Sequence, residues 1–221
     1  MKEFIRDFVT CPICKKEFSY DSVVSMAIKV SAYDLDLKPE YRGINVSLYN
    51  IITCPECCFT FQEKDRDIII DYLDEEKILK IKKFLDYIKK MDIGEIDNTS
   101  KKSLQFYKNQ LLIAAEIYSI LNLPIEVSKI LIKLSWYYRE NDETEKELGI
   151  LYYCGKILEK EFQNTEKEDD YIFCLFYLGY INYRFKRKSE AAKFLDTLLQ
   201  KYKDSTNPYI KAAKFLRGEI V

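Results

Sequence analysis

The chain contains no histidine among its 221 residues. Imidazole is the usual base in Ser-His and Cys-His nucleophilic pairs, so its absence excludes most hydrolase mechanisms. It also removes the nitrogen ligand on which many zinc sites depend. Glycine and proline are scarce, at six and five residues, which argues against a turn-rich all-β protein of this size.

An excess of charge of one sign is also missing, with 35 Lys and Arg against 36 Asp and Glu. Residues 1–62 hold seven basic and eight acidic side chains, so this segment lacks the basic character of a phosphate-binding surface. No uninterrupted apolar run approaches the ~20 residues that span a bilayer. The first seven residues carry charges where a signal peptide has its apolar core. We therefore expect a soluble, cytoplasmic protein that does not enter a membrane.

Seven cysteines in such a chain suggest metal binding or redox chemistry rather than structural disulfides. Four of them form two Cys-Pro-x-Cys motifs, Cys11–Cys14 and Cys54–Cys57. Each short spacing lets two thiolates reach one ion, and four thiolates complete a closed tetrahedral shell without a position for substrate. We predict one structural zinc ion per chain at Cys11, Cys14, Cys54 and Cys57. Iron in a rubredoxin-like site and a thiol redox switch that releases the metal are the alternatives.

The other three cysteines are predicted not to bind the metal. Cys58 directly follows a ligand, at a turn position where cysteine knuckles often use glycine for a left-handed backbone conformation. The alternative is that Cys58 replaces Cys57 as a ligand when Cys57 is damaged. Cys154 and Cys174 lie among aromatic and aliphatic residues of predicted helices, as free cysteines in a protein core commonly do. Without histidine, nothing in the sequence activates them as nucleophiles.

Between the two motifs the hydrophobic pattern has a period of two, which predicts strands near residues 25–32 and 44–53. We expect these strands to pair and so bring the two cysteine motifs together, with a loop over 33–43. After residue 62 the pattern is helical, with a break near Asp74, a candidate N-cap of the helix that follows, and a polar link over 94–100. The predicted helices span 65–91 in two parts, 102–121, 124–140, 143–163, 169–186, 189–203 and 208–219, with Ser189 and Asn207 as N-caps.

Two predicted helices carry small residues twelve positions apart, Gly179 and Ala191. This spacing is typical of tetratricopeptide repeats, in which small residues let paired helices approach closely. The predicted fold is α+β and mainly α, with a zinc-ribbon-like β-unit at 1–62 and a connecting helical segment at 63–100. Antiparallel tetratricopeptide-like helical hairpins follow at 101–221.

The two cysteine motifs, Asp34, Asp36, the segment 41–45 (YRGIN) and the segment 134–140 (LSWYYRE) resemble the bacterial domain of unknown function 2225 family. The similarity covers residues 8–203. It implies a cysteine-knuckle unit joined to tetratricopeptide-like helices, with zinc at the four motif cysteines and no settled activity. Cys58 stands where the family commonly has glycine.

Stacked helical hairpins offer an extended surface, so the sequence favours an interaction protein with an unidentified protein or peptide partner. Aromatic residues such as Trp136, Tyr137 and Tyr138 either line a groove or form the core between helices. A nucleic-acid-binding zinc ribbon is the main alternative, although four thiolates with one zinc would make the N-terminal unit more negative. The acidic pairs Asp34–Asp36 and Asp169–Asp170 are expected to be solvated. We expect no enzyme activity and name no catalytic residue.

Overall fold

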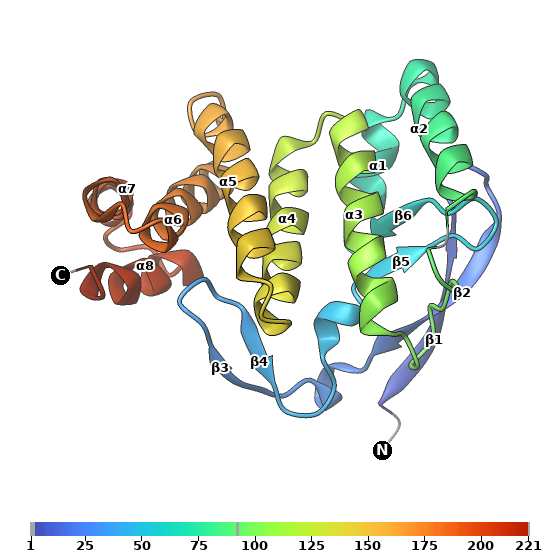
Figure 1. The fold of residues 1–221 in the computed structure, drawn as a ribbon, viewed down its shortest axis with the longest axis horizontal. Coiled ribbons are helices and arrows are strands. Elements are labelled where there is room, and N and C mark those ends of the chain that lie inside the picture. The colour runs from blue at the N-terminus through green and yellow to red at the C-terminus, as the bar shows by residue number, and fades with distance from the viewer. Residues whose placement is uncertain (1–2, 92, 221) are drawn as a thin grey trace. The chain divides into compact units, whose positions relative to one another are not determined.

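The structure, a computed structural model, describes residues 3–91 and 93–220 (Figure 1). Short antiparallel strand pairs in the first part of the chain are followed by helices, so the predicted α+β, mainly α fold is confirmed. The strands are β1 (Phe4–Thr10), β2 (Glu17–Val23), β3 (Val30–Tyr33), β4 (Pro39–Tyr41), β5 (Ile51–Thr53) and β6 (Thr60–Gln62). The α-helices are α1 (Arg66–Tyr72), α2 (Glu75–Ile88), α3 (Leu104–Ile120), α4 (Pro124–Glu140), α5 (Thr144–Glu161), α6 (Glu168–Arg184), α7 (Lys188–Lys201) and α8 (Pro208–Gly218).

The chain forms two compact units. The knuckle unit comprises the described residues of Met1–Val30 and Tyr41–Ile130, and the helical unit comprises Ser31–Glu40 with those of Leu131–Val221. The division does not follow the predicted limits at residues 62 and 100, because α3 packs on β5 and β6 and a ten-residue segment joins the later helices. Whether the predicted segments fold as separate domains stays a prediction.

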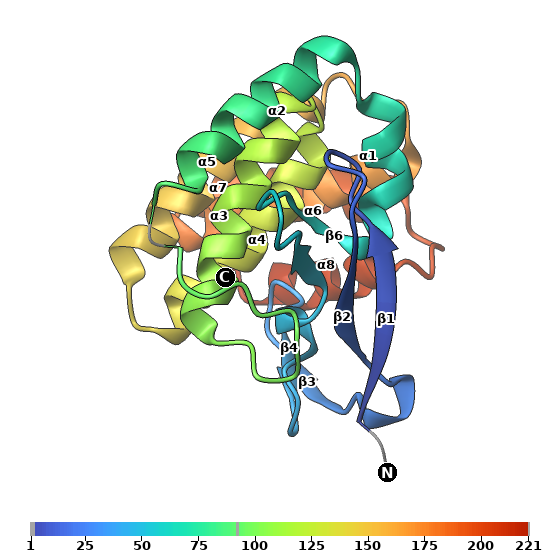
Figure 2. The same cartoon turned by 90° about the vertical axis from the view of Figure 1, so that its right-hand side faces the viewer.

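In the knuckle unit, each Cys-Pro-x-Cys motif joins the two strands of one hairpin, β1–β2 or β5–β6. Buried Val9 pairs with buried Phe18 in the first hairpin. Figure 2 shows α2 and α3 side by side, with α3 against the short β5–β6 hairpin. From α3, the Tyr118 hydroxyl donates to buried Asp65 at 2.8 Å and accepts from the Gln62 backbone N–H at 3.0 Å.

The predicted strands at 25–32 and 44–53 are wrong in extent and pairing. Ser25–Ala27 and Val46–Leu48 form 3-10 turns, and the remaining strands β3 and β5 pair with β4 and β6, not with each other. In the first of the two segments the alternating apolar residues do not face a core, since Met26 is 74% exposed, whereas Val46 and Ile52 of the second segment are buried. The Asn45 side chain accepts a hydrogen bond from the Ser47 backbone N–H, which favours the second turn.

The helices agree closely with the prediction. Asp74 separates α1 from α2, and its carboxylate accepts the Lys77 backbone N–H at 2.8 Å. Asn207 caps α8 in the same way, with Pro208 in the first turn. The expected cap at Ser189 is wrong, because α7 begins at Lys188 and Arg187 occupies the cap position. No helix in residues 3–91 and 93–220 combines the length and apolar character needed to cross a bilayer.

In the helical unit, α6 packs against α5, α7 and α8, and its residues from Ile172 to Asn182 are buried. Gly179 lies at the close approach that the small-residue pattern predicted. A Cβ atom there would lie 2.7 Å from the side chain of Leu195 on α7. The assignment of these hairpins to a tetratricopeptide repeat remains a prediction.

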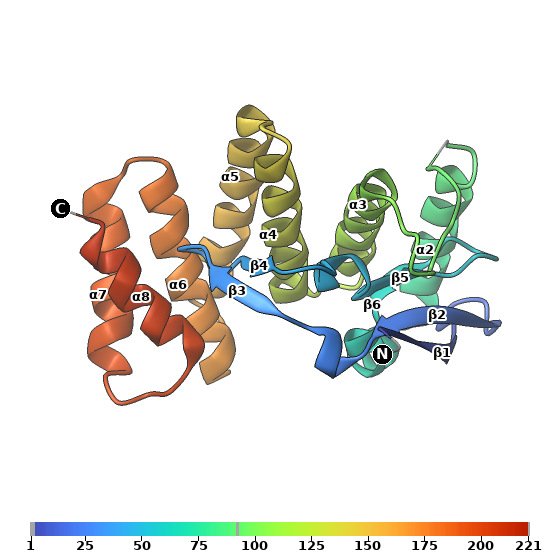
Figure 3. The same ribbon diagram turned by 90° about the horizontal axis from the view of Figure 1, so that it is seen from below.

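The segment Ser31–Glu40, which carries the turn between β3 and β4, lies against helices that follow it by a hundred residues (Figure 3). The Asp36 carboxylate is fully buried and accepts from Trp136 Nε1 at 2.8 Å and Arg139 Nη2 at 2.6 Å. Its backbone carbonyl accepts from the Tyr177 hydroxyl at 3.1 Å. These bonds fasten the tip of the hairpin to α4 and α6.

Arg139 is the centre of a larger ionic network. Its Nε donates to Glu147 at 2.8 Å, and Arg184 donates to the same carboxylate at 2.8 Å. Burial opposes the charge of Arg139, but the hydrogen bond to Asp36 raises its pKa above the usual value. The expectation that Asp34 and Asp36 are solvated is therefore wrong for Asp36, which is fully buried. The partners of Asp36 lie too far along the chain to be inferred from spacing.

Replacing Asp36 with Ala should lower the free energy of unfolding of the helical unit by about 3 kcal/mol, because Arg139 and Trp136 would lose a buried partner. Asp34 also contacts Arg139, at 3.1 Å, but its side chain is 30% exposed, so Asp34→Ala should cost about 1 kcal/mol or less. Urea denaturation followed by the fluorescence of Trp136, the one tryptophan of the chain, measures both values. Equal losses in the two variants would contradict this account.

Candidate metal centre

The two cysteine motifs fold into matching turns. In the first, the Cys11 backbone N–H donates to the Lys16 carbonyl at 2.9 Å, and Lys15 N–H donates to the Cys11 carbonyl at 3.0 Å. In the second, Cys54 N–H donates to the Phe59 carbonyl at 2.8 Å, and Cys58 N–H donates to the Cys54 carbonyl at 2.8 Å. This repeated pattern turns both thiols of each motif toward one point.

Each turn ends in a left-handed residue directly after its second cysteine. Lys15 has a φ of 62° and Cys58 a φ of 63°, the region that favours glycine. The conformation predicted for Cys58 is therefore present. Cys58 is buried but is not a member of the four-sulfur group, as expected.

The structure brings together the four cysteines predicted as ligands, and their sulfur atoms all lie within 4.8 Å of one another. Cys11 Sγ is 3.6 Å from Cys57 Sγ, and Cys14 Sγ is 3.5 Å from Cys54 Sγ. Tetrahedral zinc with bonds of about 2.3 Å places its sulfur ligands about 3.8 Å apart. The donor set and its spacing therefore fit a tetrahedral thiolate-bound metal ion.

Thiols this close to one another change each other's pKa values. The hydrogen bond with Cys54 raises the pKa of Cys11 to about 12, and the hydrogen bond with Cys11 raises the pKa of Cys57 well above its usual range. The same interaction favours the Cys54 thiolate and lowers its pKa. A divalent cation would favour all four thiolates, so metal binding at this cluster is expected to release protons.

A short segment after α2, here called the clasp (Asn98–Lys102), ties the two hairpins to each other. The Asn98 side chain exchanges two hydrogen bonds with the backbone of Thr53, directly before Cys54, at 2.7 and 3.0 Å. Its backbone carbonyl accepts from the N–H of Asp21 on β2 at 2.8 Å, and Ser100 N–H donates to the Asp21 carboxylate. The predicted polar link over 94–100 is an irregular segment between α2 and α3, as expected, but the mixed polar sequence gave no signal of these hydrogen bonds.

Lys102 completes the clasp with a buried amino group that donates to the carbonyls of Leu48 at 2.9 Å and Ile51 at 2.6 Å. Burial lowers its pKa to about 7. Lys102 thus fixes the start of β5, the strand that leads into the second motif.

Cys154 on α5 and Cys174 on α6 are fully buried and lie outside the four-sulfur group. Their burial agrees with the predicted place in the core. Both belong to the helical unit.

Cys11→Ser and Cys57→Ser should each weaken zinc binding by more than about a hundredfold, because a closed thiolate shell loses a ligand. Cys58→Ser is the matched control, since it alters the neighbouring thiol without altering the four-sulfur group, and should retain the metal. Competition with a chromogenic chelator measures the three affinities. Equal metal binding by Cys57→Ser and Cys58→Ser would refute the assignment of Cys57.

The lowered pKa of Lys102 predicts a pH dependence of stability. An unfolded lysine has a pKa of about 10.4, so between pH 7 and pH 9 the unfolded chain holds a proton that the folded chain releases. The free energy of unfolding of the native chain should therefore rise relative to that of Lys102→Met, by about 2 kcal/mol over this range. Denaturation of both proteins at the two pH values measures the difference, and a difference that stays constant or falls contradicts the prediction.

A family described as an uncharacterized protein conserved in bacteria (DUF2225) matches residues 4–218. No curated protein and no solved structure matches the chain. The family match covers nearly the whole chain, including the four-sulfur group and the Asp36–Arg139 network. The protein therefore belongs to the DUF2225 family of bacterial proteins.

Proposed function

We propose that the protein holds one structural zinc ion per chain at Cys11, Cys14, Cys54 and Cys57 and acts through protein–protein contacts of its helical unit. The observation that carries the zinc assignment is the group of four sulfur atoms, all within 4.8 Å of one another. Four thiolates leave tetrahedral zinc without an open position, so the ion supplies rigidity and no catalysis. We accordingly propose a protein that is not an enzyme.

The surroundings of the site favour this structural role. The sulfur atoms sit at the turns of two hairpins, and three of the four cysteines are buried. Iron would suit the same thiolates, which makes the identity of the metal the first question for experiment. A four-thiolate zinc site requires reduced cysteines, which supports a cytoplasmic location.

The helical unit supports the proposed interaction because it exposes large aromatic side chains on different helices. Tyr153 on α5 is 56% exposed and Phe215 on α8 is 64% exposed. Aromatic side chains such as these are enriched at the centres of protein interfaces. The balanced charge of residues 1–62 and the negative charge of a four-thiolate zinc site argue against a nucleic-acid partner.

The metal assignment is tested by elemental analysis of protein purified without added metal or a metal-affinity tag, together with thiol titration. We expect one zinc per chain and four thiols that react only after the metal is chelated. Stoichiometric iron would replace the zinc assignment. Seven thiols that react at once in metal-free protein would contradict a metal centre.

The interaction is tested by affinity capture from a bacterial lysate, followed by reconstitution of the complex from purified components. Tyr153→Ser and Phe215→Ser change one exposed aromatic each on different helices. We expect a stoichiometric partner whose affinity falls about tenfold in one of the two variants, the effect of losing one buried aromatic side chain. Equal binding to the native protein and both variants, or no reconstituted complex, would contradict the proposed surface.

A further inference from the structure

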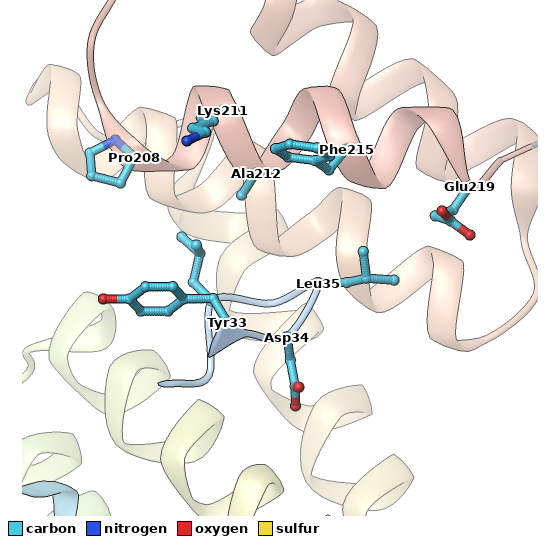
Figure 4. A pocket seen from close by; sticks show the side chains of 9 residues that line it. Tyr33, Asp34, Leu35, Pro208, Lys211, Ala212, Phe215 and Glu219 are labelled. Atoms are coloured by element: carbon cyan, nitrogen blue, oxygen red, sulfur yellow. The ribbon is translucent and has the colours of Figure 1, made fainter. Parts of the chain in front are cut away.

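The last helix carries a second face that the fold does not cover. Its inward residues, such as Ile210 and Leu216, are buried in the helical unit. A separate stripe at helical spacing, which includes Lys211, Phe215 and Glu219, lines a cavity of about 590 Å³ (Figure 4). The opposite wall of this cavity is the hairpin tip, from Tyr33 to Leu37.

The walls of the cavity are mainly apolar. Phe215 on α8 is 64% exposed and Tyr33 on the tip is 61% exposed, while Leu35 and Leu37 extend the same wall. Large apolar side chains that remain exposed around a hollow of this size are typical of a ligand or peptide site.

The tip forms a fixed wall. Asp36, between Leu35 and Leu37, is held by Trp136 and Arg139, and Leu37 has a left-handed φ of 62°. A bulky residue keeps this conformation only where its surroundings impose it. The cavity is therefore formed before any ligand binds, which lowers the entropic cost of binding.

The two ends of the α8 stripe carry opposite charges, Lys211 and Glu219 (Figure 4). Within residues 3–91 and 93–220 neither side chain has an ion-pair partner. Asp34 also lines the cavity, but its carboxylate points away from α8 and pairs with Arg139 at 3.1 Å. Eight residues of helix separate Lys211 from Glu219 by about 12 Å along the axis.

We propose that this cavity binds an extended segment of a protein partner. An apolar side chain of the segment would lie between Phe215 and the hairpin tip, an acidic residue beside Lys211 and a basic residue beside Glu219. An extended chain rises about 3.3 Å per residue, so the two charges would be about four residues apart. The proposal rests on the proposed function and specifies its surface and the chemistry of its partner.

The probes are four capped, fluorescein-labelled peptides with the same centre. Asp-Ala-Phe-Ala-Lys and Lys-Ala-Phe-Ala-Asp carry mixed charges in the two chain directions. Asp-Ala-Phe-Ala-Asp and Lys-Ala-Phe-Ala-Lys carry like charges. In fluorescence anisotropy with the full-length native protein, at least one mixed-charge peptide should bind about threefold more tightly than either like-charge peptide. A preference of this size is expected for exposed ion pairs.

Three variants of exposed residues locate the binding. Phe215→Ser should lower the affinity for the mixed-charge peptide about tenfold. Tyr153→Ser, which lies outside the cavity, should leave this affinity unchanged. Lys211→Glu makes both ends of the stripe acidic, so the preference should move to the peptide with two lysines. Trp136 emission should stay constant with unlabelled peptide, because the hairpin tip keeps its place.

The proposal is overturned by no binding at millimolar peptide, by equal binding of all four peptides, or by a charge preference that Lys211→Glu leaves unchanged. A large shift of Trp136 emission would mean that the peptide displaces the tip, and self-association abolished by Phe215→Ser would assign the face to a second copy. Both results also overturn it. If a reconstituted partner is lost in Tyr153→Ser and retained in Phe215→Ser, this inference fails while the proposed function stands.

Discussion

The convergence of four sulfur atoms from two hairpins is the constraint on which the knuckle unit depends. Cys11 and Cys57 are 46 residues apart in the sequence, yet their sulfur atoms lie 3.6 Å apart. The hairpins are short, and isolated two-stranded hairpins are marginally stable in water. The two hairpins are therefore stabilised by the thiolate cluster, by α3 packed on β5 and β6, and by the clasp, in which Asn98 hydrogen-bonds to Thr53 and Asp21.

The helical unit is held by a different interaction, the buried ion pair between Asp36 and Arg139. Breaking one partner of a buried pair is strongly destabilising, whereas an intact pair mainly specifies one arrangement. The segment that carries Asp36 comes from between the two cysteine motifs and packs with helices that follow much later in the chain. Asp36, Trp136 and Arg139, which belong to the segments that carry the family resemblance, thus meet at one point.

The sequence predicted features whose causes are local. The Cys-Pro-x-Cys turns, the cap at Asp74 and the start of α8 at Asn207–Pro208 depend on neighbouring residues, and all were found where expected. Strand pairing was missed because Met26 and Ile28 alternate with polar residues but remain exposed. The burial of Asp36 and the clasp could not be predicted, because their partners lie 45 to 141 residues away and no periodicity marks them.

The four-thiolate centre is the central claim, and X-ray absorption at the zinc edge of the purified protein tests it most directly. The chain has no histidine, so its side chains offer no imidazole nitrogen to the metal. The account predicts four sulfur neighbours at about 2.3 Å and no nitrogen or oxygen in the first shell. A shell with fewer than four sulfur atoms, or one completed by oxygen, would contradict a closed structural site at Cys11, Cys14, Cys54 and Cys57.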